Sequence, residues 1–306
     1  MLRQILSLGF VLSVCVSLQA QEKQIQDKKS ERQRTDAKNL PECDRKITYK
    51  QVGEKSYDLH VFEPKSAVPA ATGRPAIVFF FGGGWNNGDP KQFFTQCQAL
   101  ADLGMMAMSA EYRVASRDNA KVIDCIADAQ DAIAYVRSHA ADLQIDPTRI
   151  AAGGGSAGGH LAAAVATLEY RGSVADRATK DYRPNALVLF NPALVLAPTG
   201  TARDVEIKRT TSNMADRVGD KPESASPYHH LHQDLPPTII FHGRADSTVP
   251  YWTVEVFRDR AKELGAHCQL KGYDDQTHGF FNVGRPKHEE TTASMIKFLR
   301  EQKFVP

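Results

Sequence analysis

The stretch that most constrains the fold is residues 149–163, which read RIAAGGGSAGGHLAA. It predicts a short buried strand over 150–152, a turn too tight for side chains, and an alanine-rich helix to about residue 169. Gly154, Ser156 and Gly158 fit the pattern G-x-S-x-G, which holds a serine on a strained turn with its hydroxyl exposed at the sheet edge. A Cβ at either flanking glycine would meet the neighbouring strand or helix. The stretch favours an α/β fold with Ser156 as candidate nucleophile, and a purely structural turn is the alternative.

Strands and helices alternate along the rest of the chain, which is typical of a mostly parallel sheet covered by helices on both faces. We therefore predict an α/β fold with eight strands, the first two forming an antiparallel hairpin. The strands are expected at 46–52, 56–62, 76–81, 105–110, 150–152, 186–190, 238–241 and 267–273, and further helices at 91–103, 120–141, 251–264 and 287–301.

Composition sets few limits on a chain of this kind. With 306 residues, 42% of them hydrophobic, it can bury the core of one α/β domain. A formal net charge of +2 gives no electrostatic case for nucleic acid as a partner.

The N-terminal region predicts export. Arg3, an apolar run over 5–18 and Ala20 before a polar segment are typical of a secretory signal peptide over 1–20, with an uncleaved anchor as the alternative. Residues 21–45 are charge-mixed and favour a polar flexible tether, so the catalytic domain is expected over 46–306. The sequence predicts a secreted or periplasmic protein with no stable membrane insertion after cleavage.

Beyond the signal peptide, cysteine usage leaves the disulfide question open. Four cysteines allow three pairings, and none is favoured. Their wide spacing argues against a zinc site, and the histidines at 229, 230 and 232 have no acidic or cysteine partner at ligand spacing. We expect no metal and no cofactor. The four cysteines are Cys43, Cys97, Cys125 and Cys268.

Three further stretches complete a candidate catalytic site. Three glycines, 82–84, follow a predicted strand and leave backbone N–H groups open to a ligand, and the glycines of this loop have neither spacing of the phosphate-binding loops. Asp246 and His278 each lie in a loop after a predicted strand. The order serine, aspartate, histidine suits a triad in which His278 takes the proton of Ser156 and Asp246 stabilises the imidazolium. We interpret His160 and His242, which flank the site, as structural.

With these residues in place, the sequence resembles the α/β-hydrolase superfamily, in the branch of hormone-sensitive-lipase-like esterases and acetylesterase or feruloyl-esterase-like hydrolases. The resemblance covers the chain from residue 46 onward and implies the α/β-hydrolase fold. It also implies that the amides of Gly83, Gly84 and Ala157 form the oxyanion hole. One position departs from the pattern: Phe81 stands where the family usually has a histidine that steadies the loop. The matching segments are 82–85, 111–113, 145–150, 155–161, 237–243, Asp246 and 278–280.

The predicted function is a serine esterase that hydrolyses short-chain carboxylic esters through an acyl-enzyme, including O-acetyl or feruloyl esters on carbohydrate. Trp85 and Asn86, which follow the glycine loop, and Phe280, which closely follows His278, are candidate substrate contacts, although Asn86 also suits a simple polar turn. Residues 191–235 are irregular and contain few large apolar residues, which indicates a lid-like excursion unsuited to lipid. The alternatives are a serine peptidase of the prolyl-oligopeptidase type and an inactive binding protein on the same fold.

Overall fold

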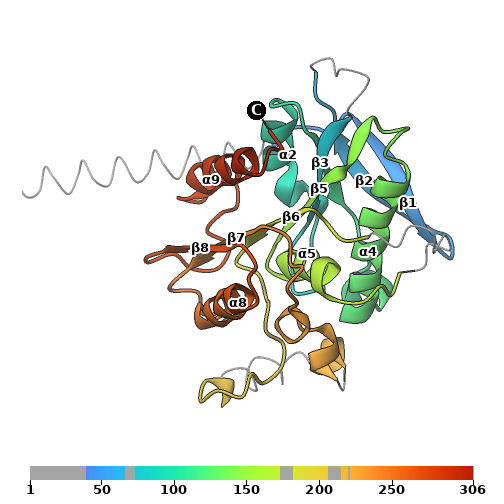
Figure 1. Cartoon of the computed structure of the whole chain (residues 1–306). Coiled ribbons are helices and arrows are strands. Elements are labelled where there is room, and N and C mark those ends of the chain that lie inside the picture. Colours follow the sequence, from blue (N-terminus) through green and yellow to red (C-terminus); the bar gives the residue numbers. More distant parts are fainter. Residues whose placement is uncertain (1–38, 66–72, 173–181, 206–214, 220, 306) are drawn as a thin grey trace, which may run out of the picture.

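The computed structural model describes residues 39–65, 73–172, 182–205, 215–219 and 221–305. The predicted signal peptide and most of the predicted tether lie outside these residues. Within them, eight strands form one sheet of order β1-β2-β4-β3-β5-β6-β7-β8 (Figure 1).

The sheet opens with the predicted hairpin, in which β1 (Arg45–Val52) pairs antiparallel with β2 (Lys55–Phe62). Strand β2 also runs antiparallel to β4, and every pairing from β4 onward is parallel. The prediction of a mostly parallel eight-stranded sheet is therefore confirmed. The remaining strands are β3 (Arg74–Phe80), β4 (Met106–Ala110), β5 (Ile145–Gly155), β6 (Ala186–Phe190), β7 (Thr238–Gly243) and β8 (Cys268–Tyr273).

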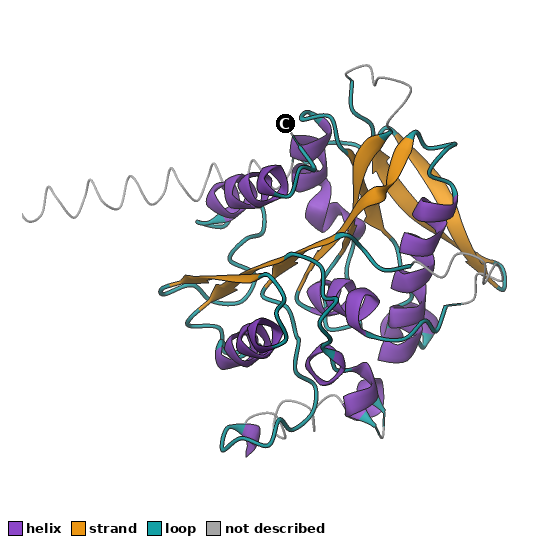
Figure 2. Cartoon of the chain, viewed as in Figure 1, coloured by secondary structure: helices purple, strands orange, loops and turns teal. Residues whose placement is uncertain are grey.

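Helices cover both faces of the sheet, as predicted (Figure 2). One face carries α4 (Val122–Ser138), α5 (Ala157–Thr167) and α8 (Trp252–Glu263), and the other carries α2 (Phe94–Ala101) and α9 (His288–Glu301) (Figure 1). The helix expected over 91–103 is divided, because a 3₁₀ turn, η1 (Pro90–Phe93), precedes α2. A short helix after β4, α3 (Ala115–Asp118), is absent from the elements expected from the sequence.

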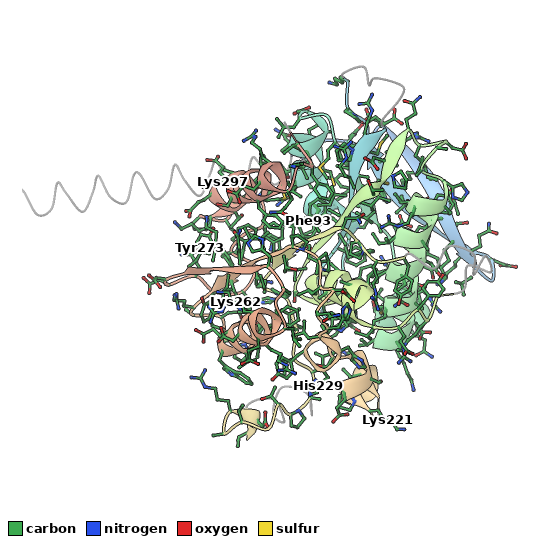
Figure 3. All side chains as sticks on the ribbon, viewed as in Figure 1. Phe93, Lys221, His229, Lys262, Tyr273 and Lys297 are labelled. Atoms are coloured by element: carbon green, nitrogen blue, oxygen red, sulfur yellow. The ribbon has the colours of Figure 1, made fainter. Side chains whose placement is uncertain are left out.

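Strand β3 shows why a continuous apolar run marks the middle of such a sheet. Alternate side chains along a strand point to opposite faces. Ile77 and Phe79 pack into the core beneath α2 and α9, while Val78 and Phe80 pack into the core beneath α4 and α5. Phe79 stacks on Phe93 of η1 with 4.7 Å between ring centres, and Phe93 lies beside the sheet in Figure 3.

Contacts with the domain begin upstream of β1, inside the segment predicted as a tether. The Asp44 N–H donates to the Val61 carbonyl at 2.8 Å, and the Asp44 carboxylate accepts from the Glu63 N–H at 2.8 Å. Cys43 is half-buried against the core on the α2 side. All four cysteines after the predicted signal peptide are free thiols in this structure.

The excursion over 191–235 is irregular, and its described residues include the short helical turns α7 (Ala215–Val218), η2 (Pro222–Ala225) and η3 (Pro227–His230). They lie beside α4 and α5, on the face of the sheet that these helices cover (Figure 1). Among the described residues, no helix has both the length and the apolar character needed to cross a membrane.

Candidate active site

Ser156 occupies the sharp turn between β5 and α5. Its backbone has φ 55° and ψ −118°, a conformation that costs a non-glycine residue about 1–3 kcal/mol. Two hydrogen bonds hold the turn: the Ser156 N–H donates to the Phe190 carbonyl, and the His160 N–H donates to the Ser156 carbonyl, each at 2.9 Å. The strained serine at the end of a parallel strand is the geometry that the glycine-rich motif predicts.

The glycines beside Ser156 allow the strand and the helix to touch. A Cβ on Gly158 would lie 1.9 Å from the carbonyl oxygen of Phe80, on β3. One on Gly154 would lie 2.4 Å from the carbonyl carbon of Gly158. No other residue fits this backbone contact, so the motif is required by packing as well as by chemistry.

The structure brings Ser156, His278 and Asp246 into one hydrogen-bonded row. His278 Nε2 lies 2.8 Å from Ser156 Oγ, and His278 Nδ1 lies 2.7 Å from Asp246 Oδ2. The three residues come after the carboxyl ends of β5, β7 and β8, where active sites of open α/β sheets form. Histidine and serine are 122 residues apart in sequence, so only the sheet places them together.

Asp246 is held as a buried carboxylate. Burial alone would raise the pKa of Asp246, but hydrogen bonds from His242, His278 and the Val249 N–H outweigh it, so the pKa lies well below its ordinary value. The Thr248 and Val249 N–H groups both donate to Oδ1 at 2.9 Å. This leaves Oδ2 to face His278, and the acid stays charged at any pH at which a histidine base works.

His242 supports this acid from the preceding strand. Its Nε2 lies 2.8 Å from the Val249 carbonyl, which can only accept, so Nε2 carries the proton. The same nitrogen lies 3.3 Å from Asp246 Oδ2. The fully buried His242 side chain thus fixes the loop that presents Asp246, in line with the structural role expected for it.

The glycine loop after β3 presents backbone N–H groups next to the serine. Gly83 and Gly84 have φ values of 128° and 62°, and a Cβ on Gly83 would lie 2.2 Å from the Asn87 carbonyl oxygen. The Gly83 carbonyl accepts from the N–H groups of Asn86 and Asn87 at 3.1 and 3.2 Å. Because the carbonyl and N–H of one trans peptide point in opposite directions, the Gly84 N–H points out of this turn.

The Gly82 N–H is already committed, since it donates to Gln92 Oε1 at 2.6 Å. The predicted oxyanion donors are the next two residues, Gly83 and Gly84, and Ala157, the first residue of α5. A helix N-terminus adds unpaired N–H groups and a partial positive charge at this point.

Phe81 takes a packing position in place of the usual histidine. Its ring stacks on Tyr112 with 4.1 Å between ring centres, and its carbonyl accepts from the Tyr112 hydroxyl at 2.7 Å. Tyr112 is fully buried, so the start of the loop is held by an aromatic pair and one buried hydrogen bond.

Two of the three predicted substrate contacts are largely inaccessible. The side chains of Trp85 and Phe280 are 2% and 3% exposed. Phe280 packs on Tyr273 with 5.0 Å between ring centres. Asn86 is half-buried, and its carbonyl accepts from the Ser116 N–H at 3.0 Å. This burial favours packing roles for Trp85 and Phe280.

Two supporting residues are visible only in the structure. Asn191, directly after β6, accepts from the Gly279 N–H at 3.0 Å and so fixes the residue after His278. Gln92 donates to Asn282 Oδ1 at 2.9 Å while it accepts from Gly82, so it links the glycine loop to the histidine loop. Asn191 shares the sequence signal of the triad, a polar residue directly after a strand, whereas Gln92 has no such signal.

A cavity of about 350 Å³ lies beside these two loops. Gly82 forms part of its wall and is itself a neighbour of the nucleophile, since a Cβ on Gly82 would lie 3.2 Å from Ser156 Cβ. Its lining mixes polar and aliphatic groups: Leu40, Gly82, Gly88, Asp89, Lys91, Gln92, Asn282 and Val283.

The three clustered histidines of the excursion bond to separate backbone carbonyls. His229 lies 2.9 Å from the Pro198 oxygen, His230 lies 3.0 Å from the Glu223 oxygen, and His232 lies 3.2 Å from the Ala166 oxygen. Figure 3 places His229 within the excursion. Across the part of the chain that the structure describes, no group of three His, Cys, Asp or Glu side chains could hold a metal ion.

Comparison with known proteins places this geometry in a family. A protein-family model described as BD-FAE matches residues 59–260. The chain is 28% identical over 245 residues to the probable carboxylic ester hydrolase LipM of Mycobacterium tuberculosis, covering 75% of this chain and 55% of the relative. Esterase LipQ of the same organism is 30% identical over 236 residues, covering 72% of this chain and 54% of that protein. The chain spans about half the length of the curated relatives it matches.

Solved structures of esterase 2 from the planctomycete Thermogutta terrifontis are similar over nearly their whole length. The butyrate-bound form is 43% identical with a TM-score of 0.79, covering 85% of this chain and 95% of that one. The sarin-phosphonylated form is 42% identical with a TM-score of 0.80, covering 87% of this chain and 97% of that one. The resemblance predicted from the motifs is confirmed, and the chain belongs to the BD-FAE family within the α/β-hydrolase superfamily.

Proposed function

We propose that this protein is a serine esterase that hydrolyses short-chain carboxylic esters through an acyl-enzyme on Ser156. The hydrogen-bonded row of Ser156, His278 and Asp246 carries the proposal, because a serine hydroxyl needs an oriented base to attack an ester at neutral pH. Carboxylic ester hydrolases among the relatives support the same reaction class.

In the acylation step, His278 Nε2 takes the proton of Ser156 Oγ as the oxygen attacks the ester carbonyl carbon. The negative charge that develops on the carbonyl oxygen is stabilised by the amides of Gly83, Gly84 and Ala157. Collapse of the tetrahedral intermediate breaks the bond to the alcohol oxygen, and His278 returns the proton to that oxygen. The products are the free alcohol and an acylated Ser156.

Deacylation repeats the sequence with water as nucleophile. His278 takes a proton from water, the hydroxide oxygen bonds to the acyl carbon, and the proton passes to Ser156 Oγ as the carboxylic acid leaves. Asp246 stays ionised throughout and stabilises the imidazolium in both halves of the reaction. Its buried hydrogen bonds and low pKa suit this role.

The acyl group is proposed to be short, and the alcohol to be a carbohydrate. Butyrate- and propionate-bound forms of the Thermogutta terrifontis esterase support the first part. The mixed polar lining of the cavity beside Gly82 supports the second, since a hydroxylated alcohol needs donors and acceptors. O-acetyl esters on polysaccharide are the proposed natural substrates, with the bulkier feruloyl esters as the alternative, and the predicted signal peptide would bring the enzyme to them outside the inner membrane.

The substitution Ser156→Ala tests the nucleophile. We expect kcat on p-nitrophenyl acetate to fall by about 10⁴-fold or more with the fold intact, because removing one triad member leaves only binding and the oxyanion hole. A fluorophosphonate should label the wild-type protein at Ser156, as organophosphorus agents modify the Thermogutta terrifontis esterase. Full activity in Ser156→Ala, or a label on another residue, would refute the assignment.

A series of p-nitrophenyl esters tests the acyl group. We expect kcat/KM to be highest for acetyl to butyryl esters and to fall at least about tenfold by a twelve-carbon chain. Release of acetate from acetylated xylo-oligosaccharides, against an acetylated cyclohexanol control, tests the alcohol. A preference for long-chain triglyceride would contradict the proposal.

A further inference from the structure

Trp85 is the residue of the glycine loop that most needs outside support. It directly follows Gly84 and has φ 57°, a left-handed conformation that bulky residues rarely adopt. Such a conformation persists only where the surroundings impose it. Its side chain is 2% exposed, so the supporting contacts are internal.

His160 supplies the principal polar contact to this side chain. The indole Nε1–H of Trp85 donates to His160 Nδ1 at 3.1 Å, and the two rings meet edge to face with 5.0 Å between centres. His160 lies in α5, one turn after Ser156. Helix α5 therefore begins directly after the nucleophile and also holds the loop that supplies its oxyanion donors.

The two nitrogens of His160 have fixed roles. An indole N–H can only donate, so Nδ1 is unprotonated, and a carbonyl can only accept, so Nε2 donates its proton to the Ala225 oxygen at 2.7 Å. His160 is fully buried, which disfavours the imidazolium and lowers its pKa to about 4. The neutral ring thus links Trp85 to Ala225 through two buried hydrogen bonds.

Ala225 belongs to the excursion over 191–235, so His160 connects the glycine loop to it. The excursion also contacts the glycine loop directly. Arg217 Nη1, on α7, donates to the Gly84 carbonyl at 3.2 Å. The hydrogen bonds Trp85–His160–Ala225 and the contact Arg217–Gly84 therefore tie two consecutive loop residues to the 191–235 excursion.

We propose that His160 is a positioning residue for the oxyanion hole, and that through it the excursion holds the glycine loop in its reactive shape. The inference rests on the proposed function, since it assigns His160 to the oxyanion donors of that reaction. His160 does not touch the substrate: it fixes Trp85, and Trp85 fixes the direction of the Gly83 and Gly84 amides.

The test compares His160→Leu, which removes both hydrogen bonds, with His160→Gln, which can supply one acceptor and one donor. Turnover of p-nitrophenyl acetate is measured per active site, counted by fluorophosphonate titration. We expect kcat to fall about 10- to 100-fold in His160→Leu with KM within about threefold, because displaced oxyanion donors raise the barrier and leave binding unchanged. His160→Gln should recover most of the loss.

His60→Leu is the matched control. His60 is also a buried histidine with a polar partner, Glu111, but it lies on β2, three strands from the strand that carries Ser156. The His60→Leu variant should be less stable than the wild-type protein but should keep the same kcat per active site. Trp85→Phe keeps the ring and removes only the donor, so kcat should fall about three- to tenfold. The double variant with His160→Leu should be no slower than His160→Leu alone.

The outcomes separate this inference from the proposed function. If the wild-type protein is not titrated by the fluorophosphonate, the esterase proposal itself fails. If the wild-type protein is titrated and His160→Leu keeps kcat per site within twofold, or changes only KM, the positioning role is wrong and the esterase proposal stands. If His160→Leu does not fold, Trp85→Phe and His160→Gln decide: unchanged kcat in Trp85→Phe overturns the inference.

Discussion

At the scale of single residues, this site depends on histidines that differ in task because they differ in surroundings. His278 is partly exposed between Ser156 and Asp246, where a base can exchange protons with substrate. His160 is fully buried between an indole N–H and a backbone carbonyl, so it is held neutral and serves as a fixed donor and acceptor. The same side chain type thus provides a base in one place and a structural hydrogen-bonding group in the other.

The buried state of His160 predicts how stability depends on pH. Its pKa is lowered from 6.5 to about 4 in the folded protein, so between these values the unfolded chain binds more protons than the folded one. Stability conferred by the neutral ring is therefore present above about pH 6.5 and is lost as the pH falls towards 4. Between pH 7 and 5 the free energy of unfolding should fall by about 2 kcal/mol from this group.

Urea unfolding at the two pH values measures this effect. His160→Gln does not titrate at this position, so the difference between pH 7 and 5 should shrink by the same amount in that variant. An unchanged pH dependence would mean that His160 is not held neutral by the fold.

At the scale of elements, strand β3 and helix α5 approach so closely that glycine is required. The Phe80 carbonyl lies where a Cβ on Gly158 would be. We expect Gly158→Ala to cost at least about 2 kcal/mol in the free energy of unfolding, measured in urea, because the backbone of a central strand would have to move. Gly265→Ala is the control: no atom lies within 4 Å of its added Cβ, so it should cost only about 1 kcal/mol for its positive φ. Equal losses in both variants would contradict the packing argument.

Most elements could be predicted because hydrophobic periodicity is a local property. The central strands and the long helices lie close to their predicted positions, with β6 at the predicted residues. Strand β5 begins at Ile145, five residues earlier than predicted, because pairing of Arg74 with Ile145 continues the ladder beyond a register shift. Asp146 and Pro147 are residues that typically lie outside a central strand. Only the pairing with β3 shows that β5 continues on both sides of them.

At the scale of the whole molecule, the site contains residues at strand ends and contacts that cross between distant elements. The three triad residues could be predicted because each comes directly after a strand or in the loop beyond it, and parallel strands bring their carboxyl ends to one edge. Bonds such as Trp85 to His160 and His160 to Ala225 join residues 75 and 65 positions apart. Hydrophobic periodicity, which relates residues a few positions apart, cannot predict such contacts. The sequence accordingly predicts Trp85 as a substrate contact, whereas its side chain is buried against α5.

The strand order also determines when, during folding, the catalytic residues come together. Ser156 lies at the end of β5 and His278 beyond β8, the last strand of the sheet, with β6 and β7 between them. The reacting atoms can meet only after three consecutive parallel pairings have formed, and such non-local contacts form slowly. Esterase activity should therefore return after most of the helical circular dichroism signal during refolding from urea. Its recovery would report docking of the last strand, and simultaneous recovery of both signals would contradict this order.

A chain that stops before β8 would carry the nucleophile and the oxyanion loop but no base, because His278 lies beyond that strand. Synthesis of nearly the whole domain must therefore be complete before the enzyme can act on any ester in the cell that makes it.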